Sequence, residues 1–215
     1  MSLPLLRRRD ALLSLAALGA LPVFAHSAHH PPMDDAPAPP PDESVYRLEA
    51  TLEDQDGHSL AWSSLQGTPV LASMFYTSCD MVCPMIFETV QATLRALSAA
   101  ERAQLRVLMV SFDPERDSPA VLKKTAQARG CDAQWMLARA DDNTTRKVAA
   151  VLGIQYRRLA NGEYNHSSVL ELLDGQGRVA ARSGKLGPAD PAMVAAIRKL
   201  QGRRAAEISS FSAVA

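Results

Sequence analysis

Between residues 46 and 202 the spacing of hydrophobic positions changes several times, which predicts strands and helices in alternation. Short apolar runs rich in β-branched and aromatic residues, at 69–76 and 105–113, are typical of buried strands. After the first run, apolar residues recur at the spacing of one helix face, at Ile86, Val90, Leu94 and Leu97. A buried strand therefore leads directly into an amphipathic helix.

The other elements are predicted from the same periods and from turn and capping residues. Alternation over 46–54 predicts a strand. A helix is predicted over 117–130, because Ser118 suits its cap, Pro119 its first position and Gly130 its end. The remaining predicted elements are a strand at 135–140, a helix at 142–153, a hairpin at 167–182 and a helix at 190–202.

This order of elements predicts an α/β fold. Strand, helix, strand, helix and strand in succession imply parallel pairing through right-handed crossovers, and the late hairpin adds antiparallel strands. We therefore expect a central mixed β-sheet flanked by helices, with a C-terminal β-hairpin. The folded domain is predicted to cover 45–203, followed by a disordered tail at 204–215 that lacks periodicity.

The composition excludes two classes of protein. The chain of 215 residues carries 23 basic and 23 acidic side chains and has a formal net charge of zero. Broad binding of nucleic acid needs an excess of Lys and Arg, so no nucleic-acid partner is expected. With 3 cysteines, the protein cannot be a scaffold built on disulfides, and its core must come from burial of apolar side chains.

The N-terminus indicates export. Three arginines at 7–9 precede an apolar stretch at 11–25 that is shorter than the roughly 20 residues of a membrane span, and small residues precede position 26. Residues 1–25 are therefore predicted to be a signal peptide, with an uncleaved anchor as the alternative. The Pro- and His-rich segment 26–44 is predicted to be a disordered linker. Both readings place the domain outside the cytoplasm, in the periplasm or at the outer face of the inner membrane.

Two cysteines, Cys79 and Cys83, follow the first buried strand, with Pro84 directly after the second. Their loop is expected at the carboxyl edge of the sheet, where open α/β sheets carry their chemistry. Because Pro84 suits the first helical position, both sulfurs should face the positive end of a helix, which lowers thiol pKa. The pair is compatible with a disulfide, a soft-metal site, a catalytic dithiol or two buried thiols. Cys131 has no partner nearby in sequence and is interpreted as a bystander.

A histidine just before the late hairpin, His166, is a candidate third ligand. Two thiolates and one imidazole form a three-coordinate set that suits Cu(I), a soft ion. Structural zinc would require a fourth protein ligand, which Asp113 or Cys131 could supply, although neither has ligand-like spacing.

Three motifs in order give the chain a resemblance to the Sco/SenC family, the exported thioredoxin-like proteins that help to assemble cytochrome c oxidase. The motifs are FYTSCDMVCP (75–84), VSFDPERDSP (110–119) and YNHSSVLELLDGQGR (164–178), and the Trp-containing segment QWMLARADD (134–142) is also similar. The resemblance covers most of the stretch from about residue 46 to about residue 200. It implies a thioredoxin-like fold.

The resemblance also implies the roles of individual residues. Cys79, Cys83 and His166 would be the copper ligands, for Cu(I) and also for Cu(II), and the two cysteines could form a reversible disulfide. Asp113 would lie beside the site or face a partner; its alternative role is a turn-forming residue before a proline. The two residues at 116–117 are expected to cap and brace the following helix.

The chain departs from the family pattern in two places. Members usually have a proline after the first cysteine, where this chain has Asp80, which adds a negative charge beside the site. The segment after the Trp-containing strand also lacks the usual Thr-Gly. Both departures suggest a divergent subgroup with another target, and neither removes a ligand.

Two functional hypotheses follow. In the first, the protein is a copper chaperone and not an enzyme, and delivers Cu(I) to the copper-bearing subunit of cytochrome c oxidase, for its binuclear copper centre, or to a similar cuproprotein. In the second, it is a thiol–disulfide oxidoreductase that reduces target cysteines, which requires Cys79 and Cys83 but not His166. Further partners would be a thioredoxin-like reductant or another copper chaperone.

Overall fold

The structure, a computed structural model, describes residues 41–212. The predicted signal peptide at 1–25, most of the predicted linker and the last residues, 213–215, lie outside the described residues. Among the residues that are described, no helix combines the length and the apolarity that crossing a bilayer requires.

A mixed sheet of seven strands forms the centre, in the order β2-β1-β5-β4-β3-β8-β9. Its middle consists of three parallel strands, β3 (Val70–Phe75), β4 (Arg106–Ser111) and β5 (Trp135–Arg139). Every residue of β3 is buried, as are all residues of β4 except the first, because helices cover both faces of the sheet. This burial explains why both strands read as continuous apolar runs.

Antiparallel strands extend the sheet on both sides. The predicted late hairpin forms β8 (Leu170–Leu173) and β9 (Val179–Ser183), and β8 pairs with β3. On the other side, β1 (Thr51–Asp54) pairs with β5 and with β2 (Ser59–Ala61). The predicted mixed sheet flanked by helices is therefore confirmed.

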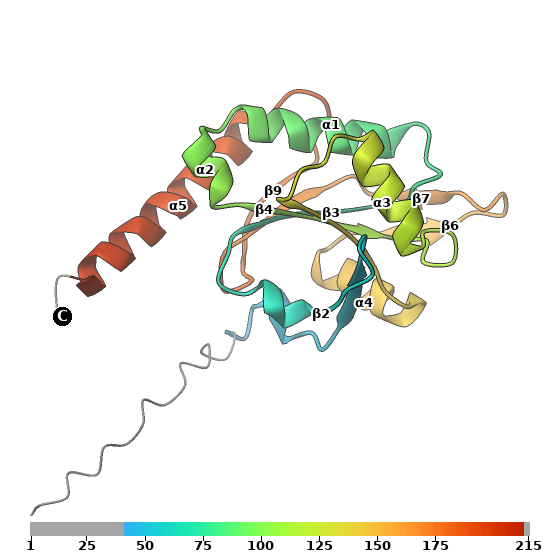
Figure 1. Ribbon diagram of the computed structural model, residues 1–215, viewed down its shortest axis with the longest axis horizontal. Helices are drawn as coiled ribbons and strands as arrows, with labels where there is room; N and C mark the ends of the chain where they lie inside the picture. Colours follow the sequence, from blue (N-terminus) through green and yellow to red (C-terminus); the bar gives the residue numbers. More distant parts are fainter. Residues whose placement is uncertain (1–40, 213–215) are drawn as a thin grey trace, which may run out of the picture. The chain divides into compact units, whose positions relative to one another are not determined.

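The crossovers decide which face each helix covers. Helix α1 (Val82–Arg95) connects β3 to β4, and α3 (Pro119–Ala128) connects β4 to β5 in the same direction across the sheet. Right-handed crossovers in one direction place both helices on one face. Figure 1 shows them above the sheet and α4 (Asp142–Val151) below it, where the chain returns toward β8.

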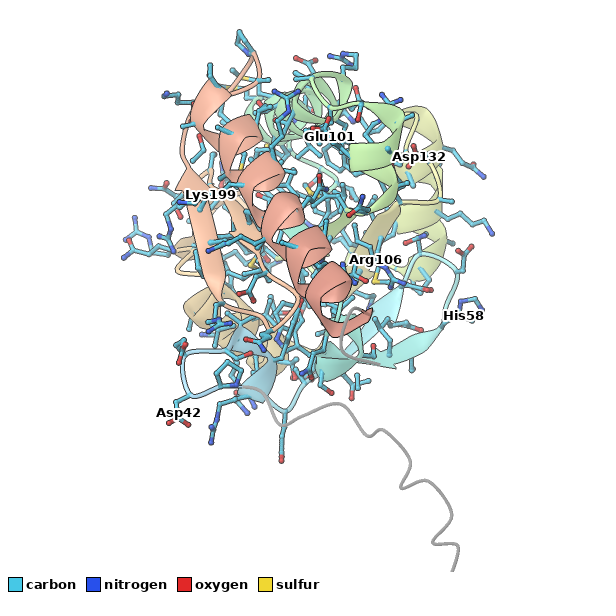
Figure 2. The ribbon with its side chains drawn as sticks, turned by 90° about the vertical axis from the view of Figure 1, so that its left-hand side faces the viewer. Asp42, His58, Glu101, Arg106, Asp132 and Lys199 are labelled. Atoms are coloured by element: carbon cyan, nitrogen blue, oxygen red, sulfur yellow. The ribbon has the colours of Figure 1, made fainter. Side chains whose placement is uncertain are left out.

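Two further helices meet near the end of α1. In the short helix α2 (Ala99–Ala103), Glu101 accepts a bond of 2.9 Å from Arg198 in α5 (Pro191–Ser212). Figure 2 looks onto α5, with Glu101 labelled near one end of it. Helix α5 continues to residue 212, through most of the segment 204–215 that was predicted to be a disordered tail. No helix-stopping residue follows 202, and two alanines, strong helix formers, occupy 205–206.

Two local predictions differ from the structure. The predicted strand at 46–54 begins instead with a 3-10 helix, η1 (Val45–Arg47), and only its last residues form β1. The carbonyl of Val45 accepts a bond of 2.7 Å from the indole of Trp62, at the start of a second 3-10 helix, η2 (Trp62–Leu65). A second, two-stranded sheet of β6 (Tyr156–Arg158) and β7 (Tyr164–His166) was not predicted at all.

Candidate metal centre

The loop between β3 and α1 places the two cysteines. Its backbone turns at Tyr76, whose carbonyl accepts a hydrogen bond from the amide of Cys79 at 3.4 Å. The amide of Cys83, the second residue of α1, then donates to the sulfur of Cys79 at 3.3 Å. The first amides of a helix have no partner within the helix, so the sulfur of Cys79 satisfies one that would otherwise be unpaired.

The start of this helix differs from the prediction by two residues. Pro84 was expected at the first helical position, but α1 begins at Val82 and Pro84 is its third residue. A proline remains compatible with this position, since the amides of the first turn make no intrahelical bond. Cys83 therefore lies within the first turn, where it is almost completely buried.

His166 reaches the cysteines from β7, the strand that pairs with β6. Its Nδ1 lies 3.3 Å from the carbonyl oxygen of Ser167, and its Nε2 lies 3.8 Å from the sulfur of Cys83. A carbonyl can only accept, so Nδ1 carries the proton and donates to it. The lone pair of Nε2 therefore points toward the sulfurs, as a metal ligand requires.

The three donor atoms converge. The sulfurs of Cys79 and Cys83 and a ring nitrogen of His166 all lie within 4.8 Å of one another. At the distances typical of zinc sites, about 2.3 Å for sulfur and about 2.1 Å for nitrogen, two ligands of one ion at an angle near 120° lie about 3.8 Å apart. That value matches the separation of Cys83 and His166, 3.8 Å. Two thiolates and one imidazole therefore fit a soft ion of low coordination number such as Cu(I).

The two sulfurs differ in acidity. Burial by itself raises the pKa of Cys79, but hydrogen bonds from the amides of Cys83 and Met81 stabilise its thiolate and leave that pKa below its usual value. Burial raises the pKa of Cys83 strongly, and the neighbouring sulfur of Cys79 raises it further. Burial also lowers the pKa of His166, which keeps its ring neutral near pH 7. The cluster thus contains one activated and one protonated thiol.

An aromatic cluster holds the histidine ring in place. The ring of His166 packs against Phe112 at a centroid distance of 4.9 Å and edge-on against Tyr76 at 6.0 Å. Tyr164, from the same hairpin, lies 5.1 Å from Tyr76, and Tyr156 stacks on Phe112 at 4.8 Å. The hairpin of β6 and β7 is therefore attached to the main sheet largely through aromatic contacts.

Asp113 supports this hairpin indirectly, through Arg116. Its buried carboxylate accepts a hydrogen bond from Arg116, and the guanidinium of Arg116 donates to the carbonyl of Gly162 in the β6–β7 turn at 2.7 Å. Asp113 is not one of the three residues whose ligand atoms converge. A hydroxyl bond of 2.8 Å from Tyr76 to Glu163 adds a second attachment at the same turn.

Asp117 attaches the cysteine loop to the next strand. Its carboxylate accepts hydrogen bonds from the amide and hydroxyl of Thr77 and from the hydroxyl of Ser111. Residues 116 and 117 were expected to brace α3, but the cap of α3 is the side chain of Ser118 alone. The acidic motif of 113–117 therefore supports the candidate site through Arg116 and Asp117.

The sequence contains a local signal for this hairpin. Asn-Gly at 161–162 between two short runs with aromatic residues is typical of a tight β-hairpin. That signal would have placed His166 on a strand of a hairpin, although a two-residue turn would have paired it with residue 157, whereas the loop has three residues and His166 pairs with Tyr156. No comparable signal marks the contact of Arg116 with the hairpin, because the two segments are distant in sequence.

Two other candidate ligand groups lie apart from the site. Cys131 is half-buried after α3, burial raises its pKa to about 11, and it does not belong to the converging group. Asp54, Asp56 and His58 lie close together at the β1–β2 turn, where His58 projects at the periphery (Figure 2). Asp56 and His58 are exposed and Asp54 is half-buried. The group stabilises the turn, since the carboxylate of Asp54 accepts hydrogen bonds from the amides of the other two residues.

The fold and the candidate site together indicate the class of protein. A mixed sheet with two cysteines at the start of the helix after the first parallel strand is the arrangement of thioredoxin-like proteins, and here His166 lies beside the cysteines. Within this class the chain belongs to the SCO1/SenC family, whose sequence model matches residues 41–202. The resemblance stated from the motifs is thereby confirmed.

Individual relatives agree with this family. A SCO1 protein homolog of Bacillus subtilis (strain 168) is 36% identical over 82 residues, which make up 38% of this chain and 42% of that protein. The match thus spans less than half of that relative's length.

Solved structures extend the likeness over the whole domain. The structure of Bradyrhizobium japonicum ScoI with copper bound has a TM-score of 0.61 and 25% identity, over 71% of this chain and 98% of that one. A SCO1/SenC family lipoprotein from Bacillus anthracis str. Ames has a TM-score of 0.64 and 24% identity, over 72% and 94% of the two chains. These matches confirm the thioredoxin-like fold.

Proposed function

We propose that the protein is a copper chaperone, which binds Cu(I) through Cys79, Cys83 and His166. The observation that carries this proposal is the convergence of these donor atoms from the β3–α1 loop and from β7, two segments far apart in sequence. Membership of the SCO1/SenC family supports it, as does the copper bound to the similar Bradyrhizobium japonicum protein. Copper is the cargo of such a protein and is released again. Cu(II) is the second oxidation state that we propose for this site.

The recipient that we propose is the copper-bearing subunit of cytochrome c oxidase, at its binuclear copper centre, or a related cuproprotein. Delivery by ligand exchange requires a ligand that can leave without disturbing the core. His166 meets this requirement, since it is half-buried and belongs to a hairpin outside the main sheet. The sulfurs, which are more deeply buried, would then leave the ion last.

The N-terminal sequence supports a proposal for the compartment. We propose that the protein is exported and acts in the periplasm or at the outer face of the inner membrane. This setting suits a dithiol that alternates between reduced and disulfide forms. A thioredoxin-like reductant would keep Cys79 and Cys83 reduced, and a second copper chaperone would supply the ion.

A second function, thiol–disulfide exchange, is favoured by the unequal acidity of the two cysteines. The depressed pKa of Cys79 makes it the attacking thiolate, while the raised pKa of Cys83 keeps that thiol protonated until the mixed disulfide forms. In this reaction the thiolate of Cys79 attacks a target disulfide and releases one target thiolate. The sulfur of Cys83 then loses its proton, closes the Cys79–Cys83 disulfide and releases the second target thiolate.

Metal analysis of the reduced protein tests the first proposal. Wild type, His166→Ala and the matched control His58→Ala are loaded with Cu(I) under anaerobic conditions and passed through a desalting column. We expect equimolar copper in wild type and in the control, because His58 is exposed and is not part of the converging donor set. Loss of one of three ligands should weaken retention in His166→Ala by about tenfold or more.

The two functions separate in the same set of variants. Copper binding needs all three residues, whereas reduction of a disulfide substrate should be unchanged in His166→Ala and absent in Cys79→Ser. A reduced wild-type protein that retains no copper, with its three ligands intact, would leave thiol–disulfide exchange as the remaining function.

A further inference from the structure

Two exposed methionines lie beside the candidate metal centre. In the described part of the chain four large apolar side chains are exposed, and two of them are Met81, at 77%, and Met85, at 42%. Single exposed apolar residues are common on protein surfaces. Here both residues belong to the nine-residue stretch from 77 to 85 that also contains both cysteines. Packing does not account for either position, because neither thioether is buried in the core.

The helix brings the two methionines together. Met81 directly precedes α1 and Met85 is its fourth residue, so they are separated by one turn and lie on the same face. Cys83 lies between them in sequence and is 2% exposed. The start of α1 therefore has a buried thiol on its inner side, and Met81 and Met85 are exposed on its outer side.

We propose that Met81 and Met85 form an outer copper site, which captures Cu(I) and passes it inward to Cys79, Cys83 and His166. This inference rests on the proposed chaperone function and deepens it by assigning an entry route. Thioether sulfur is a soft ligand that selects Cu(I) over zinc and over harder ions. It is also neutral, so it binds the ion without first losing a proton.

The burial of the inner donors explains why such a site is useful. Cys79 is 7% exposed and Cys83 is 2% exposed, so little of either residue is open to an incoming ion. Asp80, which is exposed between Cys79 and Met81, adds a negative charge that attracts a cation to this side. Met81 and Met85 thus offer soft ligands at the surface, whereas the two cysteines are buried.

Each transfer step is a ligand exchange without electron transfer. A soft-ligand Cu(I) complex gives up one donor as a thioether of Met81 or Met85 binds the ion, and its remaining ligands leave as the inner sulfurs bind. The copper stays Cu(I), the thioethers stay neutral, and each thiol that becomes a ligand releases its proton to solvent.

Loading kinetics test the outer site. The reduced full-length chain is mixed with the Cu(I) complex of bathocuproine disulfonate, and transfer is followed by the loss of the colour of that complex. In the double variant Met81→Leu/Met85→Leu, leucine keeps the apolar surface and the helix propensity but removes both sulfurs. We expect transfer to slow by about tenfold. The control Met136→Leu, at a half-buried methionine in β5, should load at the wild-type rate.

A spectroscopic measurement tests the same site without relying on rates. In selenomethionine-labelled Cys79→Ser/Cys83→Ser/His166→Ala protein the inner ligands are gone, and X-ray absorption should show selenium next to the remaining copper. The signal should disappear when Met81→Leu/Met85→Leu is added. Absence of copper–selenium scattering in the labelled protein would overturn the outer site.

The outcomes distinguish this inference from the proposed function. Final copper content reports on the inner cluster, and the rate of reaching it reports on the methionine pair. A wild-type protein that holds no copper refutes the chaperone function itself. A wild-type protein that holds copper, with the leucine variant loading at an equal rate, refutes only the outer site. Because leucine preserves the apolar patch, a slower rate cannot be ascribed to lost hydrophobic docking.

Discussion

At the scale of single residues, the two cysteines of the site have different chemistry although they are only four positions apart. Cys79 precedes the helix and its sulfur accepts the amide of Cys83, whereas the sulfur of Cys83 lies inside the first turn. Backbone amides stabilise a thiolate, and a buried environment favours the neutral thiol. The same short segment therefore holds one thiol with a lowered pKa and one with a raised pKa.

Alkylation rates should reveal this difference. In a Cys131→Ser background, iodoacetamide should modify the single remaining thiol of Cys83→Ser about tenfold faster at pH 7.5 than that of Cys79→Ser. The reason is that the depressed pKa of Cys79 populates its thiolate, and burial keeps the thiol of Cys83 protonated. Mass spectrometry of quenched samples measures both rates. Equal rates across pH 6 to 9 would contradict the assigned asymmetry.

At the scale of elements, the hairpin of β6 and β7 determines whether the histidine reaches the sulfurs. It does not pair with the seven-stranded sheet. Its turn is held by Arg116, which bonds the carbonyl of Gly162 and the buried carboxylate of Asp113, and by the bond from Tyr76 to Glu163. A third contact, from Arg158 to Glu115, is exposed on both sides.

Loss of each of these contacts should change the Cu(I) affinity by a different amount. Arg116→Ala should lower Cu(I) affinity by about tenfold, because a ligand-bearing hairpin that loses its support no longer presents His166 in one position. Arg158→Ala is the matched control and should change affinity little, since exposed ion pairs contribute about 0–1 kcal/mol. Competition with a Cu(I) chelator measures affinity, and hydrogen exchange of 156–166 should rise only in Arg116→Ala. Equal affinities in the two variants would show that Arg116 does not position the ligand.

The sequence predicted the sheet better than it predicted the contacts that hold the β6–β7 hairpin beside the cysteines. Strands β3 and β4 are buried on both faces, so their runs of apolar residues are recognisable without any partner. The 3-10 helix at 45–47 has no such period, because it is fixed by a bond from Trp62 and by the Ser44 cap.

The candidate ligands could be recognised in the sequence because the cysteines and the histidine are chemically distinctive, and the structure brings the three together. Their support could not be recognised, since Arg116 and Gly162 are 46 residues apart and meet only through the fold. The Asn-Gly turn was the one local signal for this hairpin, and recognising it would have predicted the strand that carries His166. Contacts between segments that are distant in sequence are what the local pattern cannot supply.

At the scale of the whole molecule, stability should depend on a buried carboxylate away from the site. Glu171 in β8 is completely buried, and burial raises its pKa from the usual 4.5 to about 7, although Arg182 opposes the shift. Arg182 approaches one carboxylate oxygen at 2.6 Å, but within the described residues neither oxygen accepts a well-directed hydrogen bond. We therefore give burial more weight than the ion pair.

The sign of the pH effect follows from this shift. The folded protein binds the proton of Glu171 more tightly than the unfolded chain does, so this group lowers the free energy of unfolding as pH rises from about 4.5 to about 7. Glu171→Gln should therefore gain stability relative to wild type between pH 5 and pH 8, by up to about 3 kcal/mol. Urea unfolding at each pH measures the difference. Glu53→Gln, at a half-exposed ion pair in β1, is the control, and a wild-type-like pH profile in Glu171→Gln would contradict the assignment.

Copper loading should stabilise the molecule because the ion would join parts that the sheet does not join. The cysteines belong to the start of α1, whereas His166 belongs to the separate hairpin, so unfolding of the loaded protein must break both attachments at once. Ligand bound only by the folded state adds about 4 kcal/mol at a thousandfold excess over the dissociation constant. For a domain of this size each kcal/mol raises Tm by roughly 2–4 °C. We expect Cu(I) to raise Tm in wild type and in His58→Ala, and a chelator to reverse the rise.

In His166→Ala the two sulfurs would hold the ion without a bond to the hairpin, so the rise in Tm should be much smaller. An equal rise would mean that the histidine does not bind the ion.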